Sequence, residues 1–179
     1  MAPIALLLAL VLSSMMGQTT ASRKGIQARP RAAGSTVLHV ALGDSSTRKW
    51  LRTGWNQNES AGRETWVWSQ GPSSVIELPL PTGRDLLMVL DCQPFTFTGS
   101  PRQTVAIVLN GMSIATVALR PGRQTYSVAL PGAALRPSNT IEFHYAYARR
   151  PQEVDRQSGD TRSLAVLWRS IDLTTAPKP

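Results

Sequence analysis

The sequence predicts an all-β protein, a single antiparallel β-sandwich of jelly-roll form, and two observations lead there. Segment 103–119 reads QTVAIVLNGMSIATVAL, where two runs of β-branched and apolar residues flank Asn110-Gly111. Asn-Gly favours a type I′ hairpin turn, because both central positions of that turn need φ > 0. Elsewhere, short strand-like runs alternate with turn residues, and no amphipathic helix of normal length is visible.

This hairpin is expected to lie inside a sheet that a second layer covers. Strand alternation points Val105, Ile107 and Leu109 to one face and Ala106 and Val108 to the other. Both faces are therefore largely apolar, which is typical of a strand with another layer packed over it.

Strand-like composition and flanking turn residues predict the other strands. They are expected at 35–42, 74–78, 86–90, 125–130, 140–147 and 164–173. In 140–147, alternation places the isoleucine and the aromatic residues on one face, and Glu142 and His144 on the other. Segments 50–71 and 149–162 are expected to be long polar loops, which are uncommon unless they are functional.

The chain of 179 residues, with a formal net charge of +8, is long enough for one domain with a real core. Residues 1–21 resemble a secretory signal peptide, because the apolar run 4–12 is too short to span a bilayer. The alternative is an uncleaved N-terminal anchor. A flexible basic leader at 22–34, the sandwich at 35–173 and a tail at 174–179 complete the expected organisation.

The expected location is secreted or periplasmic, at a bacterial cell envelope. Cys92 is the one cysteine, so no intrachain disulfide is possible, and export without disulfides suits a bacterial envelope. Cys92 follows an apolar run and is expected to be buried as a small hydrophobe. No transmembrane helix is expected in the mature chain.

Nothing in the sequence predicts catalysis or a cofactor. Glycoside hydrolysis needs two carboxylates at a defined separation, and no pattern pairs the acidic loop residues. The two histidines lie far apart in sequence, so a shared transition-metal site is not expected. Structural calcium held by Asp44, Asp155 and Asp160 stays open. The basic residues are scattered without a nucleic-acid-binding motif, so the charge points to acidic polysaccharide or a membrane surface.

Tryptophan is concentrated in segment 50–71, which holds four of the 5 in the chain. Trp55, Trp66 and Trp68 lie there among amides, carboxylates and arginines. Flat aromatic faces stack on sugar rings while polar side chains bond the hydroxyls, so these residues are candidates for a carbohydrate site. The alternative is that Trp66 and Trp68 begin a strand and bury their rings in the core.

Two patterns resemble a family of bacterial envelope and polysaccharide-associated β-sandwich domains. The first is Gly54-Trp55, then Glu59, then Trp66-x-Trp68-Ser69-x-Gly71; the second is Pro151, then Gly159-Asp160-x-Arg162-x-Leu164. The part between them is similar to galactose-binding-like jelly-roll modules attached to glycosidases. This resemblance implies a carbohydrate-linked sandwich and no particular reaction.

The leading function is therefore non-catalytic carbohydrate binding, with acidic polysaccharide among the candidate ligands. The alternative is an accessory subunit in surface-polysaccharide assembly that binds protein partners, and a glycan hydrolase or lyase is a third class. The candidate site residues are Trp55, Glu59, Trp66, Trp68, Asp160 and Arg162. We expect Arg162 to pair with Glu59 or Asp160 and to fix the two polar segments beside Trp55.

Overall fold

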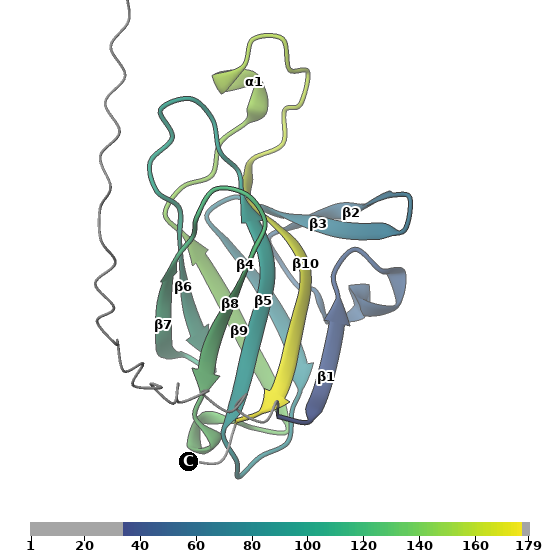
Figure 1. Ribbon diagram of the computed structural model, residues 1–179, viewed down its shortest axis with the longest axis vertical. Helices are drawn as coiled ribbons and strands as arrows, with labels where there is room; N and C mark the ends of the chain where they lie inside the picture. Colours follow the sequence, from purple (N-terminus) through teal and green to yellow (C-terminus); the bar gives the residue numbers. More distant parts are fainter. Residues whose placement is uncertain (1–33, 177–179) are drawn as a thin grey trace, which may run out of the picture. The chain divides into compact units, whose positions relative to one another are not determined.

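The computed structural model describes residues 34–176. Their strands form two antiparallel sheets that enclose one hydrophobic core (Figure 1), so the predicted antiparallel β-sandwich is confirmed. The expected signal peptide at 1–21 and nearly all of the expected leader at 22–34 lie outside the described residues. No helix within 34–176 is long and apolar enough to cross a membrane.

The larger sheet is built around β10, which runs from Leu164 to Thr175. Its strand order is β2-β3-β10-β5-β8, and β1 also pairs with β10. β3 pairs with the first part of β10, and β1 pairs with the second part. The other strands of this sheet are β1 (Thr36–Ala41), β2 (Trp55–Ala61), β3 (Glu64–Gln70), β5 (Leu86–Pro94) and β8 (Gln124–Leu130).

The smaller sheet has the strand order β4-β9-β6-β7. Its strands are β4 (Ser73–Pro79), β9 (Ser138–Tyr145), β6 (Thr104–Leu109) and β7 (Met112–Ala118). The helices of the described chain are short: the 3₁₀ helices η1 (Ser45–Trp50) and η2 (Gly132–Ala134), and α1 (Pro151–Val154).

The Asn-Gly hairpin is confirmed, because Asn110 has φ 51° and Gly111 has φ 82°, as a type I′ turn needs. Of its two apolar faces, the one with Val105, Ile107 and Leu109 is buried in the core. The expectation that the hairpin sits inside its sheet is only half right. β6 lies between β9 and β7, but β7 is the edge strand.

Alternation along β9 matches the prediction: Ile141, Phe143 and Tyr145 are buried, while Glu142 and His144 point outward. Phe143 and Trp168 are among the largest fully buried side chains. Cys92 is buried as expected. Burial raises the pKa of its thiol to about 12, so it carries no reactive thiolate at neutral pH.

The expectation of a long loop at 50–71 is wrong. This segment contains the end of η1 and then the β2–β3 hairpin, in which Glu59 pairs with Trp66 and Ser60 with Thr65. Its polar residues hid the strands, since β2 carries few apolar side chains. β10 also runs to Thr175, so the predicted tail at 174–179 begins inside a strand.

Candidate functional site

Trp55 lies in the core and offers no ring to a ligand. Its side chain is 6% exposed, and its ring meets Phe143 and Trp168 edge-on at centroid distances of 6.4 and 6.1 Å. The indole N–H donates to the backbone oxygen of Val75 at 2.7 Å. The assignment of Trp55 to a carbohydrate site is therefore wrong, because its ring is buried between aromatic residues of both sheets and its N–H is already bonded.

Trp66 and Trp68 lie in a strand, as the alternative to a sugar site predicted. Their rings, however, are not in the core. The residues of β3 that face inward are Val67 and Ser69, while the two tryptophans are half-buried on the outer face of the sheet. The Trp66 indole N–H donates to Glu59 Oε2 at 3.2 Å. The Arg169 guanidinium lies 5.5 Å from the centre of the Trp66 ring. Of the two indoles, Trp66 is thus the one held by a hydrogen bond and a cation–π contact.

Arg162 joins the two polar segments, as expected, and it bonds both candidate carboxylates rather than one. Its guanidinium donates to Asp160 from Nε at 3.0 Å and from Nη2 at 2.7 Å, and to Glu59 Oε1 from Nη1 at 2.5 Å. Since Glu59 also accepts from Trp66, the cluster lies beside Trp66 and not beside Trp55. We call Glu59, Asp160 and Arg162 the arginine clasp.

Electrostatics keep Asp160 and Arg162 of the clasp charged at neutral pH. Hydrogen bonds from Arg162 hold the pKa of Asp160 below its ordinary value, although partial burial opposes this. The same bonds, with Glu59 contributing, raise the pKa of Arg162. The clasp remains partly open to solvent, with side-chain exposures of 30%, 28% and 37% for Glu59, Asp160 and Arg162. It therefore resembles a structural tie at the surface more than a buried ion pair.

Replacing Arg162 with alanine should lower the free energy of unfolding by about 1–2 kcal/mol, because two carboxylates lose charge-assisted bonds. Chemical unfolding at neutral pH measures this. Asp160 has a lowered pKa in the folded state, so its contribution is present above its unfolded pKa and lost as the pH falls through the folded value. The difference between wild type and variant should therefore shrink below about pH 4.

The matched control for this variant is Arg52→Ala, which removes a more exposed arginine–glutamate pair with Glu77. Its effect should stay within about 1 kcal/mol, as for most surface ion pairs. Equal stability of Arg162→Ala and wild type would show that the clasp does not hold the two segments.

A line of aromatic rings continues from β3 over the loop after β5, and the sequence reading missed it. Phe95 meets Trp68 edge-on at 6.1 Å, Phe97 follows Phe95 at 6.0 Å, and Tyr147 meets Phe97 at 6.0 Å. The Tyr147 hydroxyl donates to the backbone oxygen of Phe95 at 2.6 Å, which fixes the end of the line. The alternation Phe95-x-Phe97 was the available signal, but it lies beyond the apolar run that marked the strand.

This aromatic line borders a depression of about 420 Å³ between the loop and α1. Small-molecule sites typically occupy about 300–1,000 Å³, so the depression is large enough for a small ligand. Its lining combines the two phenylalanines with threonine hydroxyls on one side and residues of the α1 segment on the other. The segment 149–162 is polar as expected, with α1 as a single short helical turn inside it.

The described carboxylates and histidines do not make a metal site. Within residues 34–176, no group of three or more His, Cys, Asp or Glu side chains is placed to hold a metal ion. Asp44 instead accepts the Ser46 amide at 2.7 Å, Asp155 accepts the Gln157 amide at 2.9 Å, and Asp160 bonds Arg162. The candidate calcium ligands are therefore used locally and separately.

Comparison with known proteins finds similarity among solved structures. No family model matches the sequence, and no curated protein matches it. The chain is similar to the C-terminal CBM6 of a marine laminarinase from Zobellia galactanivorans, with TM-score 0.47, 10% identity, and coverage of 77% of this chain and 98% of that one. A carbohydrate-binding module of lichenase 5A from Cellvibrio mixtus, solved with cellotriose, gives TM-score 0.46, 10% identity, and coverage of 79% and 98%.

A family GH115 4-O-methyl-α-glucuronidase matches 91% of this chain with TM-score 0.48 and 9% identity, and the chain spans 19% of that protein's length. The structural neighbours therefore include carbohydrate-binding modules, the class of domain that the sequence patterns resemble. Similarity at this level concerns the sandwich arrangement of strands.

Proposed function

We propose that this chain is a non-catalytic carbohydrate-binding module whose ligand lies on the outer face of the larger sheet, against Trp68 and Phe95. The observation that carries this proposal is that β3 directs two half-buried indoles outward while its smaller residues fill the core. Burying large apolar rings is ordinarily favourable, so outward tryptophans in a well-packed sandwich point to a binding surface.

Trp68 is the principal stacking residue in this proposal. Its ring is perpendicular to that of Phe95, with an interplanar angle of 81°, so the two rings meet edge to face and are not stacked in parallel. A sugar ring can lay its C–H face on the indole while its edge meets the phenylalanine. Trp66, which Arg169 and Glu59 already engage, supports the platform from the side.

Amide side chains stand close enough along the sheet to bond sugar hydroxyls. Leu167 pairs with Trp68 on one side and with Gln93 on the other, so these three residues form one row across the sheet. Gln70 lies two residues beyond Trp68 on the same face of β3. Amides donate and accept hydrogen bonds at once, which suits the paired hydroxyls of a sugar.

The charge state of Asp160 supports binding without catalysis. Glycoside hydrolysis needs one carboxylic acid whose pKa is raised so that it can donate a proton. Arg162 instead lowers the pKa of Asp160, which keeps it ionised. The role we assign to Glu59, Asp160 and Arg162 is to hold the β2–β3 hairpin and the α1 segment beside the platform.

The proposed setting is a bacterial cell envelope, outside the cytoplasm, as the N-terminal sequence suggests. An accessory subunit that binds protein partners would present a broad apolar surface. Within residues 34–176, Met112 at the hairpin tip, 55% exposed, is the one large hydrophobic side chain that is mostly exposed. No observation therefore favours that alternative over carbohydrate binding.

Replacing Trp68 with alanine should weaken glycan binding at least about tenfold, which is the usual cost of losing a central aromatic contact. The full chain would first be screened on a glycan array of neutral and acidic polysaccharides. Affinity for the best ligand would then be measured by isothermal titration calorimetry for both proteins at physiological salt.

Trp50→Ala is the matched control, since it removes a half-buried indole at the end of η1, outside the proposed platform. It should leave the affinity within about twofold of wild type. Binding that is unchanged in Trp68→Ala, or no binding of wild type to any glycan, would overturn the proposal.

A further inference from the structure

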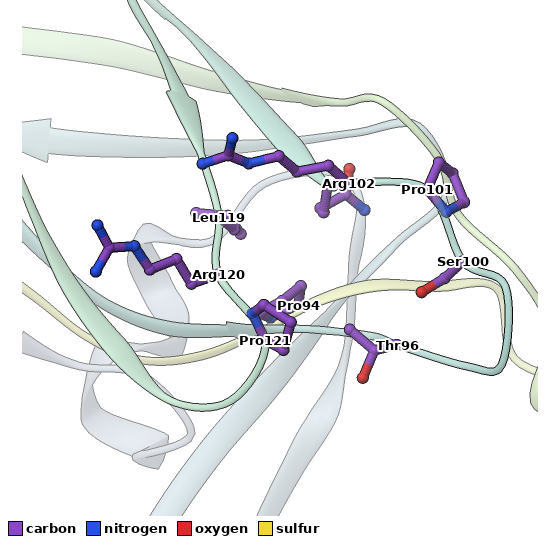
Figure 2. A pocket seen from close by; sticks show the side chains of 9 residues that line it. Pro94, Thr96, Ser100, Pro101, Arg102, Leu119, Arg120 and Pro121 are labelled. Carbon is purple, nitrogen blue, oxygen red and sulfur yellow. The ribbon is translucent and has the colours of Figure 1, made fainter.

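A second depression lies on the other side of the loop after β5, and two arginines border it. β6 and β7 pair in register, with Thr104 opposite Ala118, and the amide of Leu119 donates to the oxygen of Gln103 at 2.9 Å. The antiparallel register therefore continues past the strand ends, and the next opposed positions are Arg102 and Arg120. Their side chains extend toward the same side of the depression (Figure 2).

These two arginines are like charges in opposed positions, an arrangement that destabilises a strand pair. In the part of the chain that the structure describes, no carboxylate lies within ion-pair distance of either guanidinium. Arg123, by contrast, bonds both Asp91 and Glu64. An anion between Arg102 and Arg120 would offset the repulsion that the fold leaves uncompensated.

The depression beside them has the composition of a small-ligand site. Its volume is about 370 Å³, near the lower end of the range for small-molecule pockets. Pro121 provides exposed apolar surface and Pro94 and Leu119 line the depression as buried residues, while Thr96 and Ser100 provide hydroxyls (Figure 2).

The walls of this depression are held in place by two hydrogen bonds, one buried and one at the surface. Gln103 Nε2 donates to the oxygen of Tyr147 at 2.8 Å, and the amide of Arg120 donates to the Tyr126 hydroxyl at 2.7 Å. Both arginine-bearing segments are therefore fixed before a ligand arrives, which reduces the ordering cost of binding.

We propose that this depression is a subsite for a uronate residue, a sugar that carries a carboxylate. The carboxylate lies between the guanidinium groups of Arg102 and Arg120, since a planar oxyanion matches the guanidinium fork. The sugar ring lies over the exposed Pro121, and the hydroxyl side chains of Thr96 and Ser100 bond its hydroxyls. The chemistry assigned is that of an acidic polysaccharide, in line with the formal net charge of +8.

This inference rests on the proposed carbohydrate binding and adds the class of sugar. Thr96 lines both this depression and the one beside α1, so the loop after β5 separates two adjacent subsites. A polysaccharide that crosses the loop meets the aromatic line on one side and the arginine pair on the other. The arginine pair then selects for acidic sugars, while Trp68 contributes affinity that does not depend on charge.

The test measures binding of oligogalacturonates and of their carboxyl-reduced counterparts to the full chain. The double variant Arg102→Gln/Arg120→Gln should lose about tenfold or more in affinity for the acidic oligosaccharide, and each single variant a smaller part of this. Affinity for the reduced oligosaccharide should stay unchanged. Without ligand, the variants should be at least as stable as wild type, because a charge repulsion is removed.

Arg136→Gln is the control for net charge, because Arg136 precedes β9 at the opposite end of the sandwich. It should change oligogalacturonate affinity by less than about twofold. An equal loss in Arg136→Gln and in the pocket variants would reduce the effect to bulk charge and overturn the inference. So would oligogalacturonate binding that survives the double variant.

Two further outcomes separate this inference from the proposed function. Binding of neutral glycans that depends on Trp68, together with no preference for uronates, would leave the carbohydrate-binding proposal standing and remove the uronate subsite. Binding to phosphatidylglycerol vesicles that needs both arginines, without any glycan binding, would assign the pair to a membrane surface and overturn both.

Discussion

Replacing Trp55 with alanine should lower the free energy of unfolding by about 3–5 kcal/mol, the usual cost of deleting a buried aromatic side chain. Trp55 belongs to the larger sheet, but its indole contacts Phe143 and bonds the oxygen of Val75, both in the smaller sheet. The variant therefore leaves a cavity between the sheets and removes one of the two hydrogen bonds to the Val75 oxygen, which also accepts the Arg52 amide at 2.9 Å. Urea unfolding at neutral pH measures the loss.

Trp66→Ala provides the comparison for Trp55→Ala, because it removes the same side chain from the outer face. It should cost about 1–2 kcal/mol, as it opens no core cavity. Trp55→Phe should recover most of the stability lost in Trp55→Ala and leave a deficit of about 1–2 kcal/mol for the missing N–H bond. A loss below about 1 kcal/mol in Trp55→Ala would contradict the assignment of this residue to the core.

The sequence predicted the framework of the fold well, because the strands with one buried face carry strong patterns. The Asn110-Gly111 turn needs a backbone conformation that few residue pairs tolerate, so it could be located from the residues alone. Alternation likewise revealed the buried face of β9. The β2–β3 hairpin gave no such signal, since β3 places Trp66 and Trp68 outward and Ser69 inward, against the ordinary rule.

The contacts of the candidate site residues could be predicted only in part, for a reason that lies in side-chain chemistry. Arg162 had two candidate carboxylates in two segments, and one guanidinium has enough donors to bond both. Trp55 was misassigned because its neighbours in sequence are polar, while its neighbours in space are Phe143 and Trp168. Such contacts depend on how the two sheets face each other, which local sequence does not specify.

The pairing of the two arginines at the second depression could not be predicted from the sequence, for a similar reason. Arg102 and Arg120 are opposed because the β6–β7 register continues beyond the strands. A basic composition scattered along the chain does not reveal which charges meet. The hairpin that could be predicted from its turn is thus the element that brings these two charges together, at the end away from the turn.

Replacing Gly54 with alanine should destabilise the protein by about 3 kcal/mol or more, through both backbone strain and a steric clash. Gly54 has φ +77°, and a Cβ there would lie 2.0 Å from the backbone oxygen of Ser73. Neither side of this contact can move freely. The oxygen of Gly54 accepts the Gln70 amide at 2.8 Å, and the oxygen of Thr53 accepts the Val75 amide at 2.9 Å.

Gly71→Ala separates the two causes, because Gly71 has φ +74° but no atom within 4 Å of the added Cβ. It should lose about 1–2 kcal/mol, the cost of the left-handed conformation alone. The excess loss in Gly54→Ala, measured by urea unfolding of both variants, then reports the close approach of Gly54 to β4. Equal losses would show that β4 can yield, and that the position of Trp55 between the sheets depends on its own contacts instead of on the glycine before it.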